Sequence, residues 1–395
     1  MLSDTHVSII KALYFNNVTS SLEISKTTGV SIPTITKHIE DLIAAGYIIE
    51  KGLALSPTGR RPMVYSLVAE KHFILSIATD LFYTRMVIVD MNGNFVTETR
   101  EIELSLLDNP LALDHLITAT NDFIDHSGIK RSKLFAAGIS MPGFIDVPDG
   151  NNRSYLITGD KSLRDILTEQ LGLPVFIDND SSVIALAELK FGIGKVKSEI
   201  MVINLSWGVG LGMIISNKIY RGFRGYAGEF SHIPIFDNNK ICNCGKRGCL
   251  ETQASLLTIQ DDAAEEIRKG TFTSLRLENG KVSISSLIAE ALKGDSLSIK
   301  LISFAGYQIG RAIAILIHIL NPEVIVLSGR ASKAGKFWLA PVQQAINDYS
   351  IPTLTEGTDI ILSKMGFDAQ LVGSAALAIE NMSKELFARQ KVNKV

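Results

Sequence analysis

Three stretches near the start of the chain space their apolar residues as amphipathic helices do, and a hairpin pattern follows them. The stretches span residues 6–16, 22–28 and 33–45, and the hairpin spans 47–67 with short strands at 47–50 and 64–67. In the third stretch, one face collects the apolar side chains of Ile32, Ile35, Ile39, Leu42 and Ile43. The pattern predicts two helices joined by a short turn, with one face of the second helix free to contact a partner.

The turn and the hairpin give this segment its functional interpretation. Gly29 permits a tight turn, and Ser31 is the expected N-cap of the third helix, which has Pro33 in its first turn. The loop of the hairpin holds Arg60 and Arg61, as a DNA-binding wing does. We predict a winged helix-turn-helix DNA-binding domain over residues 1–68; the alternative is a small helical bundle for protein contacts. The expected DNA contacts are Ser31, Thr34, Thr36, Lys37, Arg60 and Arg61.

From residue 71 onward the pattern changes to alternating strands and helices, and it occurs twice. The first copy has strands at 73–78 and 86–89, with turns at Asp80 and at Asn92-Gly93. The second has strands at 200–205 and 211–215, with turns at 207–210 and at Asn217-Lys218. This echo predicts an α/β protein with two lobes of the actin-like ATPase type. We expect residues 71–190 and a C-terminal helix at 379–395 in the first lobe, and residues 191–378 in a second lobe with a metal site and a dimerisation surface.

Composition narrows the setting of the protein. The chain has 395 residues, of which 46% are hydrophobic and 20% charged, enough for two or three compact units. The N-terminus lacks the apolar run of a signal peptide, and the apolar run at 312–320 contains His318 and is too short to cross a bilayer. A cytoplasmic location in a bacterium is expected. The first 68 residues hold six Lys or Arg and five Asp or Glu, so DNA binding is argued from the motif alone.

All three cysteines lie in one short segment. Cys242, Cys244 and Cys249 follow His232 in a run rich in Gly and Asn, and an odd number of cysteines does not suit a disulfide framework. Three thiolates and one imidazole complete a tetrahedral zinc shell with no position left for water. We predict a structural Zn²⁺ site; the alternatives are three unrelated buried thiols or a catalytic zinc.

Polar residues suited to binding sugar hydroxyls flank apolar strands elsewhere. Asn179 and Asp180 follow one strand, and Glu229 and Glu251 stand on either side of the cysteine segment. A carboxylate or an amide binds paired hydroxyls, and a carboxylate also serves as a base in phosphoryl transfer. Each of these residues, taken alone, is equally compatible with a helix cap or a surface acid.

Several segments together resemble the ROK family of repressors and sugar kinases. The segment 205–251 carries spaced glycines with GEFSH, CNCG and GCLE, and further similar blocks are SMPGFID (140–146), DNDSSVIALAE (178–188), NPEVIVLSG (321–329) and AQLVGSAALA (369–378). The resemblance covers nearly all of residues 71–395. Together with a winged helix in front, it is greatest to the family's repressor branch, such as its N-acetylglucosamine and xylose repressors.

The resemblance implies roles for particular residues. Its sugar-binding positions correspond to Asn179, Asp180, Glu229, His232 and Glu251, and Asp180 stands at the base position of the family's kinases. His232 matches a residue that both binds zinc and touches the sugar, which the two distinct nitrogens of an imidazole allow. Ser231 occupies a position that is usually glycine in the family, and it is expected to narrow the pocket or add a hydroxyl contact.

The chain departs from the family's kinases where they bind ATP. Their first phosphate loop reads Asp, any residue, Gly, Gly, Thr, whereas this chain has Asp80-Leu81-Phe82-Tyr83-Thr84 with bulky side chains in place of the glycines. Ser206 and Trp207 change the second phosphate loop, and Ser328 replaces one of two paired glycines near the nucleotide. These departures predict a sensor that does not bind ATP and has no catalytic residues.

The sequence therefore predicts a sugar-responsive transcription repressor of carbohydrate-utilisation genes. It would bind operator DNA as a homodimer or a dimer of dimers, and a sugar or sugar phosphate in the cleft between the lobes would modulate it. The first alternative is an active ROK-type sugar kinase, phosphorylating a hexose with ATP and carrying a DNA-binding appendage. The second is a sensor that answers to a partner protein.

Overall fold

The computed structural model describes residues 2–54 and 61–387. By compactness the chain divides into two units, one formed by residues 1–179 together with 371–395 and the other by residues 180–370. The domain borders expected from the sequence, at residues 1–68, 71–190 and 191–378, stay predictions. The expected helix at 379–395 lies partly outside the described residues.

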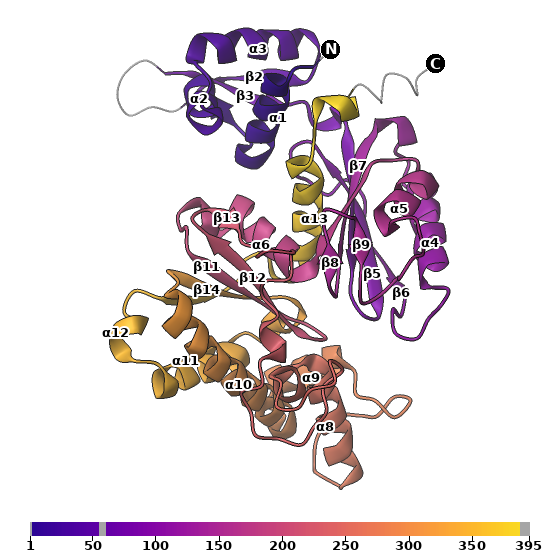
Figure 1. Ribbon diagram of the computed structural model, residues 1–395, viewed down its shortest axis with the longest axis vertical. Helices are drawn as coiled ribbons and strands as arrows, with labels where there is room; N and C mark the ends of the chain where they lie inside the picture. The colour runs from indigo at the N-terminus through magenta and orange to yellow at the C-terminus, as the bar shows by residue number, and fades with distance from the viewer. Residues whose placement is uncertain (1, 55–60, 388–395) are drawn as a thin grey trace. The chain divides into compact units, whose positions relative to one another are not determined.

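The N-terminal segment of the first unit is a winged helix (Figure 1). Helices α1 (Asp4–Asn16), α2 (Ser21–Thr28) and α3 (Ile32–Ala44) pack beside a three-stranded sheet in the order β1-β3-β2. Its strands are β1 (Thr19–Ser20), β2 (Ile48–Leu53) and β3 (Met63–Leu67). Gly29 adopts φ 73° after α2, as the predicted tight turn requires. The fold confirms the predicted helix-turn-helix with a hairpin.

Two details of α3 differ from expectation. Ser31 stands at the N-cap, but its hydroxyl pairs with Thr34 Oγ1 at 2.8 Å and not with the helix backbone. Ile35, Ile39 and Leu42 are buried as predicted, whereas Ile32 is 42% exposed and Ile43 is half-buried. Residues 31–34 are all exposed, so the first turn of α3 stands clear of the core and the buried face begins only at Ile35.

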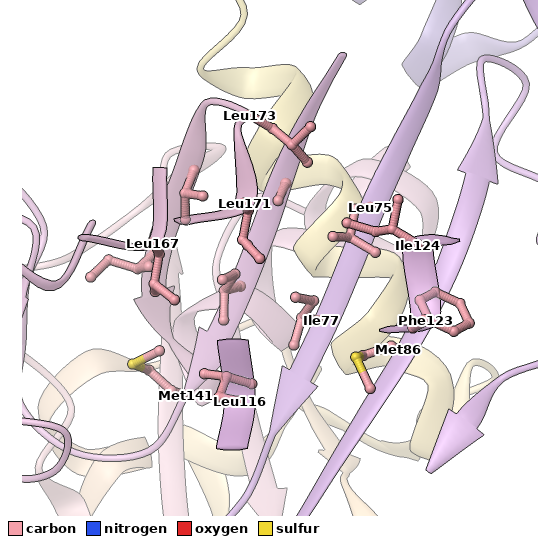
Figure 2. Packing of buried hydrophobic residues seen from close by; sticks show 14 of the residues in the cluster. Leu75, Ile77, Met86, Leu116, Phe123, Ile124, Met141, Leu167, Leu171 and Leu173 are labelled. Carbon is pink, nitrogen blue, oxygen red and sulfur yellow. The ribbon is translucent and has the colours of Figure 1, made fainter. Parts of the chain in front are cut away.

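The rest of the first unit is built on a five-stranded sheet in the order β10-β7-β4-β5-β6. β5 runs antiparallel to both β4 and β6, and β7 is parallel to both β4 and β10. The strands are β4 (Phe73–Thr79), β5 (Tyr83–Asp90), β6 (Arg100–Glu103), β7 (Leu134–Met141) and β10 (Val175–Asn179), with a small hairpin of β8 (Ile145–Asp146) and β9 (Asn151–Asn152) nearby. Figure 2 shows the core on one sheet face, where Leu75 and Ile77 pack with Leu116 of α4 (Ala112–His126) and Leu167 of α5 (Leu163–Leu171).

The opposite face of this sheet receives α13 (Ala369–Glu380). Ser76 donates a hydrogen bond to Leu371 O at 2.6 Å, and Ser374 donates one to Ile77 O at 3.0 Å. A Cβ atom added to Gly138 would lie 1.8 Å from Ser374 O, so only glycine permits this close approach. At its far end, α13 meets the winged helix, where Lys11 Nζ donates to Glu380 O at 2.7 Å.

The second unit repeats this arrangement in a sheet of order β13-β12-β11-β14-β15. β12 is antiparallel to β11 and β13, and β14 is parallel to β11 and β15, so both sheets share one strand order and one set of directions. The strands are β11 (Ile200–Leu205), β12 (Val209–Ile215), β13 (Lys218–Ile219), β14 (Val324–Ser328) and β15 (Asp359–Leu362). The predicted internal repeat is confirmed, and the fold is a winged helix-turn-helix followed by an actin-like ATPase fold.

Helices cover the second sheet and extend the unit. They are α6 (Asp180–Phe191), α7 (Glu251–Ala254), α8 (Leu256–Arg268), α9 (Ile284–Lys293), α10 (Ser296–Leu320), α11 (Lys336–Tyr349) and α12 (Pro352–Thr355). By length and composition alone α10 is apolar enough to cross a membrane, but 61% of its most apolar window is buried within the fold. Gly310 of α10 faces α11 so closely that a Cβ would lie 2.5 Å from Val342 O. This packing is typical of a core helix.

Candidate functional site

Asp180 occupies the first position of α6, directly after β10. Its Oδ2 atom accepts a hydrogen bond from Asn204 Nδ2 at 3.1 Å, and its Oδ1 atom accepts one from the Ser181 N–H at 2.7 Å. Asn204 lies near the end of β11 and is only 4% exposed. This amide was not among the predicted site residues, although a single amide inside the apolar run IMVINL was a usable signal. The two bonds fix the orientation of the Asp180 carboxylate.

Glu251 begins α7 and reaches back to the turn between β11 and β12. Its Oε2 atom accepts a hydrogen bond from the Val209 N–H at 3.1 Å. Gly208 leaves room for this carboxylate, because a Cβ there would lie 2.9 Å from Glu251 Oε1. Burial raises the pKa of Glu251, whereas the Val209 N–H and the Ser231 side chain lower it by hydrogen bonding. Ser231 is buried, so the hydroxyl expected to add a contact in the pocket is directed at Glu251.

Glu229 completes a cluster of three carboxylates with Asp180 and Glu251. Burial of the carboxyl group, followed by the charges of Asp180 and Glu251, raises the pKa of Glu229 to about 7. The Glu229 side chain is nevertheless 41% exposed, so a ligand can reach it from the solvent. Three acidic groups that feel one another's charge form a site rich in hydrogen-bond acceptors. Such a site suits donor groups such as hydroxyls.

His232 joins this carboxylate cluster to the cysteine segment. Its Nε2 atom lies 4.0 Å from Glu229 Oε2, and its Nδ1 atom lies 3.5 Å from Cys242 Sγ. Burial lowers the pKa of His232, which favours the neutral ring that binds a metal. The two ring nitrogens thus face two different clusters, and the double role of this residue stays a prediction.

The four predicted metal ligands converge, and their ligand atoms all lie within 4.8 Å of one another. Cys244 Sγ and Cys249 Sγ are 3.6 Å apart, close to the separation of about 3.5 to 3.8 Å that a tetrahedral zinc shell imposes on its ligands. Gly248 is essential to this loop, because it adopts φ 80° and a Cβ there would lie 2.4 Å from Phe236 O. The three cysteines are free thiols, so the donor set fits a metal with a preference for sulfur and nitrogen.

Asn179 belongs to the other compact unit, at the end of β10. Its side-chain Nδ2 donates to Gly143 O at 3.1 Å, which brings the DNDSS segment against the SMPGFID segment. A second amide, Asn152, was not predicted; its Nδ2 donates to Pro142 O at 3.0 Å and its Oδ1 accepts from the Ser154 N–H at 2.9 Å. No sequence motif marked Asn152, because its contact with Pro142 joins two segments ten residues apart.

The first phosphate loop of the kinases corresponds here to the turn from β4 to β5. Asp80 Oδ1 accepts hydrogen bonds from the N–H groups of Phe82 and Tyr83, each at 2.8 Å. The Asp80 N–H in turn donates to Tyr83 O at 2.8 Å. The N–H groups of Asp80, Phe82 and Tyr83 therefore donate within the turn itself. None of Leu81, Phe82 and Tyr83 has the positive φ that a glycine would allow.

The second altered loop places Trp207 in the interior. Trp207 is only 7% exposed, and the guanidinium carbon of Arg330 lies 5.5 Å from the centroid of its ring. Arg330 also stacks on Phe367 at 4.5 Å. Ser328 is fully buried at the end of β14, and its hydroxyl has no hydrogen-bond partner within the described residues. Side chains thus fill the surroundings of this loop.

The predicted DNA contacts lie mainly on the first turns of α3. Ser31, Thr34 and Lys37 are exposed, whereas Thr36 is half-buried and its hydroxyl donates to Ile32 O at 3.0 Å. Arg61 is exposed just before β3 begins, and Arg60 lies outside the described residues.

Comparison with known proteins agrees with this architecture. Residues 83–381 match the ROK family, and residues 2–49 match the winged helix-turn-helix DNA-binding family. The xylose repressor of Caldicellulosiruptor bescii is 28% identical over 382 residues, which cover 95% of each chain. The glucokinase of Halalkalibacterium halodurans is 34% identical over 253 residues, 62% of this chain and 77% of the enzyme.

A solved structure covers almost the whole fold. It is described as a ROK family transcriptional regulator, a homolog of the E. coli MLC protein, and it is 25% identical with a TM-score of 0.77, covering 99% of this chain and 100% of its own. The match to the ROK family spans most of the chain, and the xylose repressor and the transcriptional regulator cover 95% and 99% of it. This chain belongs to the ROK family.

Proposed function

We propose that this protein is a sugar-responsive transcription repressor that binds operator DNA and does not phosphorylate its effector. One observation carries the proposal: a winged helix precedes a ROK fold in which three carboxylates cluster, while bulky side chains occupy the turns that correspond to the phosphate loops. The near full-length similarity to a xylose repressor supports the same function. The regulated genes would be those of carbohydrate utilisation.

The acidic cluster of Asp180, Glu229 and Glu251 would hold the effector through its hydroxyls, with His232 and Asn179 as further contacts. Each carboxylate accepts hydrogen bonds from a pair of hydroxyls, and Asn204 and Val209 hold two of the carboxylates in place. Three acidic groups also repel an anion. An uncharged sugar or a neutral derivative therefore suits the cluster better than a sugar phosphate.

A structural Zn²⁺ would be bound by His232, Cys242, Cys244 and Cys249. A zinc ion in this set holds its loop in a closed tetrahedral shell and performs no chemistry on a substrate. The loop connects directly to two of the three acids of the sugar cluster, since Glu229 precedes His232 and Glu251 follows Cys249. The metal would thus position the sugar contacts.

The operator would be contacted by Ser31, Thr34, Thr36 and Lys37 on α3 and by Arg60 and Arg61 in the wing. A homodimer, or a dimer of dimers, in the cytoplasm would place two winged helices on two half-sites. The effector regulates such a protein only if it binds the DNA-free arrangement more tightly, with a usual coupling of about 1 to 3 kcal/mol.

An active sugar kinase with a DNA-binding appendage is the second candidate. The retained Asp180 and the similarity to a glucokinase favour it. The turn at Phe82 and Tyr83 argues against it, because its backbone donors are already engaged by Asp80. Buried Trp207 argues against it as well.

A thermal-shift screen of sugars, sugar phosphates and ATP tests the proposal. A ligand that binds only the native state raises the melting temperature. We expect one or more neutral sugars to stabilise the protein and to change its affinity for fragments of its own upstream region, whereas ATP gives no shift. Stabilisation by ATP, with no effect of any sugar on DNA binding, would favour the second candidate.

A further inference from the structure

Three side chains of the winged helix form a cluster that the proposed function leaves unused. His6 lies on α1, and His38 and Asp41 lie on α3, so the cluster joins the recognition helix to the first helix. His38 Nδ1 lies 3.1 Å from His6 Nε2. Asp41 Oδ2 lies 3.5 Å from His6 Nε2 and 3.8 Å from His38 Nδ1. The three ligand atoms therefore form a small triangle.

We propose that His6, His38 and Asp41 form a second metal site, for Zn²⁺ or a similar divalent transition-metal ion. Two imidazoles and a carboxylate are a common donor set for such ions. A tetrahedral shell with metal to ligand distances of about 2.0 to 2.1 Å separates its ligands by roughly 3.3 to 3.4 Å. The three measured separations, 3.1, 3.5 and 3.8 Å, bracket that value. Small side-chain shifts suffice to bring all three atoms onto one ion.

The surroundings give this site one closed and one open side. The His6 side chain is 10% exposed and that of His38 is 22% exposed, whereas that of Asp41 is 56% exposed. An ion can enter from the Asp41 side and keep water as its fourth ligand, as three-ligand zinc sites do. This openness distinguishes the site from the four-ligand cysteine site.

Ser3 forms hydrogen bonds with His6 Nδ1, the ring nitrogen that does not face the proposed ion. In the metal-free protein the Ser3 N–H donates to His6 Nδ1 at 3.0 Å, so the neutral ring carries its proton on Nε2. Metal binding at Nε2 displaces that proton and places one on Nδ1. Ser3 Oγ lies 2.9 Å from Nδ1 and can accept a hydrogen bond from it. Ser3 therefore offers a hydrogen-bonding atom to either form of the ring.

His38 and Asp41 lie on the same helix, α3, as the predicted DNA contacts Thr34 and Lys37, with Ser31 at its N-cap. Lys37 precedes His38, and the exposed first turn of α3 carries Ser31 and Thr34. An ion bound to α1 and α3 together would fix the angle of α3 and so its fit to a major groove. This consequence for DNA binding rests on the proposed repressor function, but metal binding itself does not.

Metal content of the full-length protein tests the site without DNA. The protein is dialysed against buffered Zn²⁺ and then analysed for metal and protein. We expect two zinc ions per chain for the wild type and one for His38→Ala or Asp41→Asn. His126→Ala, which removes an exposed histidine from α4, is the matched control and should keep two. Ser3→Ala should raise the dissociation constant of the second ion by about 10 to 100 times.

Cobalt separates the two sites in the same protein. Co²⁺ bound to thiolates gives strong sulfur-to-metal charge-transfer bands, whereas Co²⁺ at His6, His38 and Asp41 gives only weak ligand-field bands. In Cys244→Ser the thiolate bands should weaken while the weak bands remain, so failure of the zinc proposal and failure of this one are distinguishable. Equal metal content in the wild type, His38→Ala and Asp41→Asn, with no weak bands in Cys244→Ser, would overturn the proposal and leave a hydrogen-bonded cluster only.

Discussion

The carboxylate of Glu251 accepts a hydrogen bond from the backbone N–H of Val209, at 3.1 Å. Glu251 stands two residues after Cys249, and Val209 begins β12. The bond therefore ties the cysteine segment to the sheet of the second unit. Loss of the metal should therefore displace Glu251 and weaken sugar binding.

Replacement of one thiolate tests that connection. Cys244→Ser should lower the metal content and the melting temperature and weaken sugar binding, because binding energies of about 10 to 16 kcal/mol in zinc-finger peptides show how strongly such a site supports folding. Elemental analysis, thermal unfolding and calorimetry measure the three effects. Asn243→Ser, in the same turn, should change none of them. A metal-free wild type would refute the structural zinc site.

Asp180 should contribute to sugar affinity through its charge. Asp180→Asn keeps the shape of the side chain but removes a charged acceptor, whose hydrogen bonds are typically worth about 1.5 to 3 kcal/mol. We expect sugar affinity to fall by roughly 10 to 150 times, and the response of operator binding to sugar to weaken in parallel. Calorimetry measures the affinity. Asp165→Asn on α5 serves as the control, since this aspartate is exposed and distant in sequence. Unchanged affinity in Asp180→Asn would remove Asp180 from the site.

The wing should bind phosphate groups of the DNA backbone. A double replacement of Arg60 and Arg61 by Ala should weaken operator binding and reduce the slope of log affinity against log salt by about 1 for each phosphate that is no longer neutralised. Fluorescence anisotropy over a range of salt concentrations measures both. Lys130→Ala removes an exposed charge outside the winged helix and should leave the slope unchanged. An unaltered slope in the double variant would show that the wing does not touch phosphates.

Asp295 should stabilise the second unit above acidic pH. It is the N-cap of α10, where its Oδ1 accepts from the Ser298 N–H at 2.9 Å. Burial on its own raises the pKa of Asp295, but hydrogen bonds from the backbone of Ser274 and Ser298 and from the Ser298 and Thr273 side chains outweigh it and bring the pKa to about 2. Because the folded pKa lies below the unfolded value of about 3.9, this stabilisation is complete above that value and is lost as the pH falls toward 2.

Chemical denaturation of Asp295→Ala measures this contribution. Loss of a helix cap costs typically about 1 kcal/mol, and the difference from the wild type should shrink below pH 4. A difference that stays constant from pH 7 to pH 2.5 would contradict the assigned role of the Asp295 charge.

The sequence predicted the helices and strands well where capping residues or turn residues stand at their ends. The predicted start of the second helix lies one residue from the observed start, where Ser20 forms a capping box with Glu23 that was not predicted. The repeated strand and turn pattern predicted the internal repeat, but the order of the five strands in each sheet is known only from the structure. Ile32 was misplaced because periodicity alone does not show where a helix meets its neighbours.

Pairings between distant segments could not be predicted. His6 and His38 are 32 residues apart, and only the packing of α1 against α3 brings their rings together. Asn204 becomes a partner of Asp180 only after β11 and α6 pack. The cysteine site was different, because its four ligands lie close together in the sequence. The domain borders and the roles assigned to the sugar-binding and DNA-binding residues stay predictions.

The central claim is that the protein binds a sugar and does not phosphorylate it. The most direct measurement combines calorimetry with the best sugar from the screen and a coupled assay of ADP release with the same sugar and ATP. We predict saturable sugar binding with no sugar-dependent ADP release, because phosphoryl transfer depends on phosphate positioning that the Phe82 and Trp207 loops no longer provide. Sugar-dependent ADP release at an ordinary kinase turnover of about 1 to 100 per second would contradict the claim.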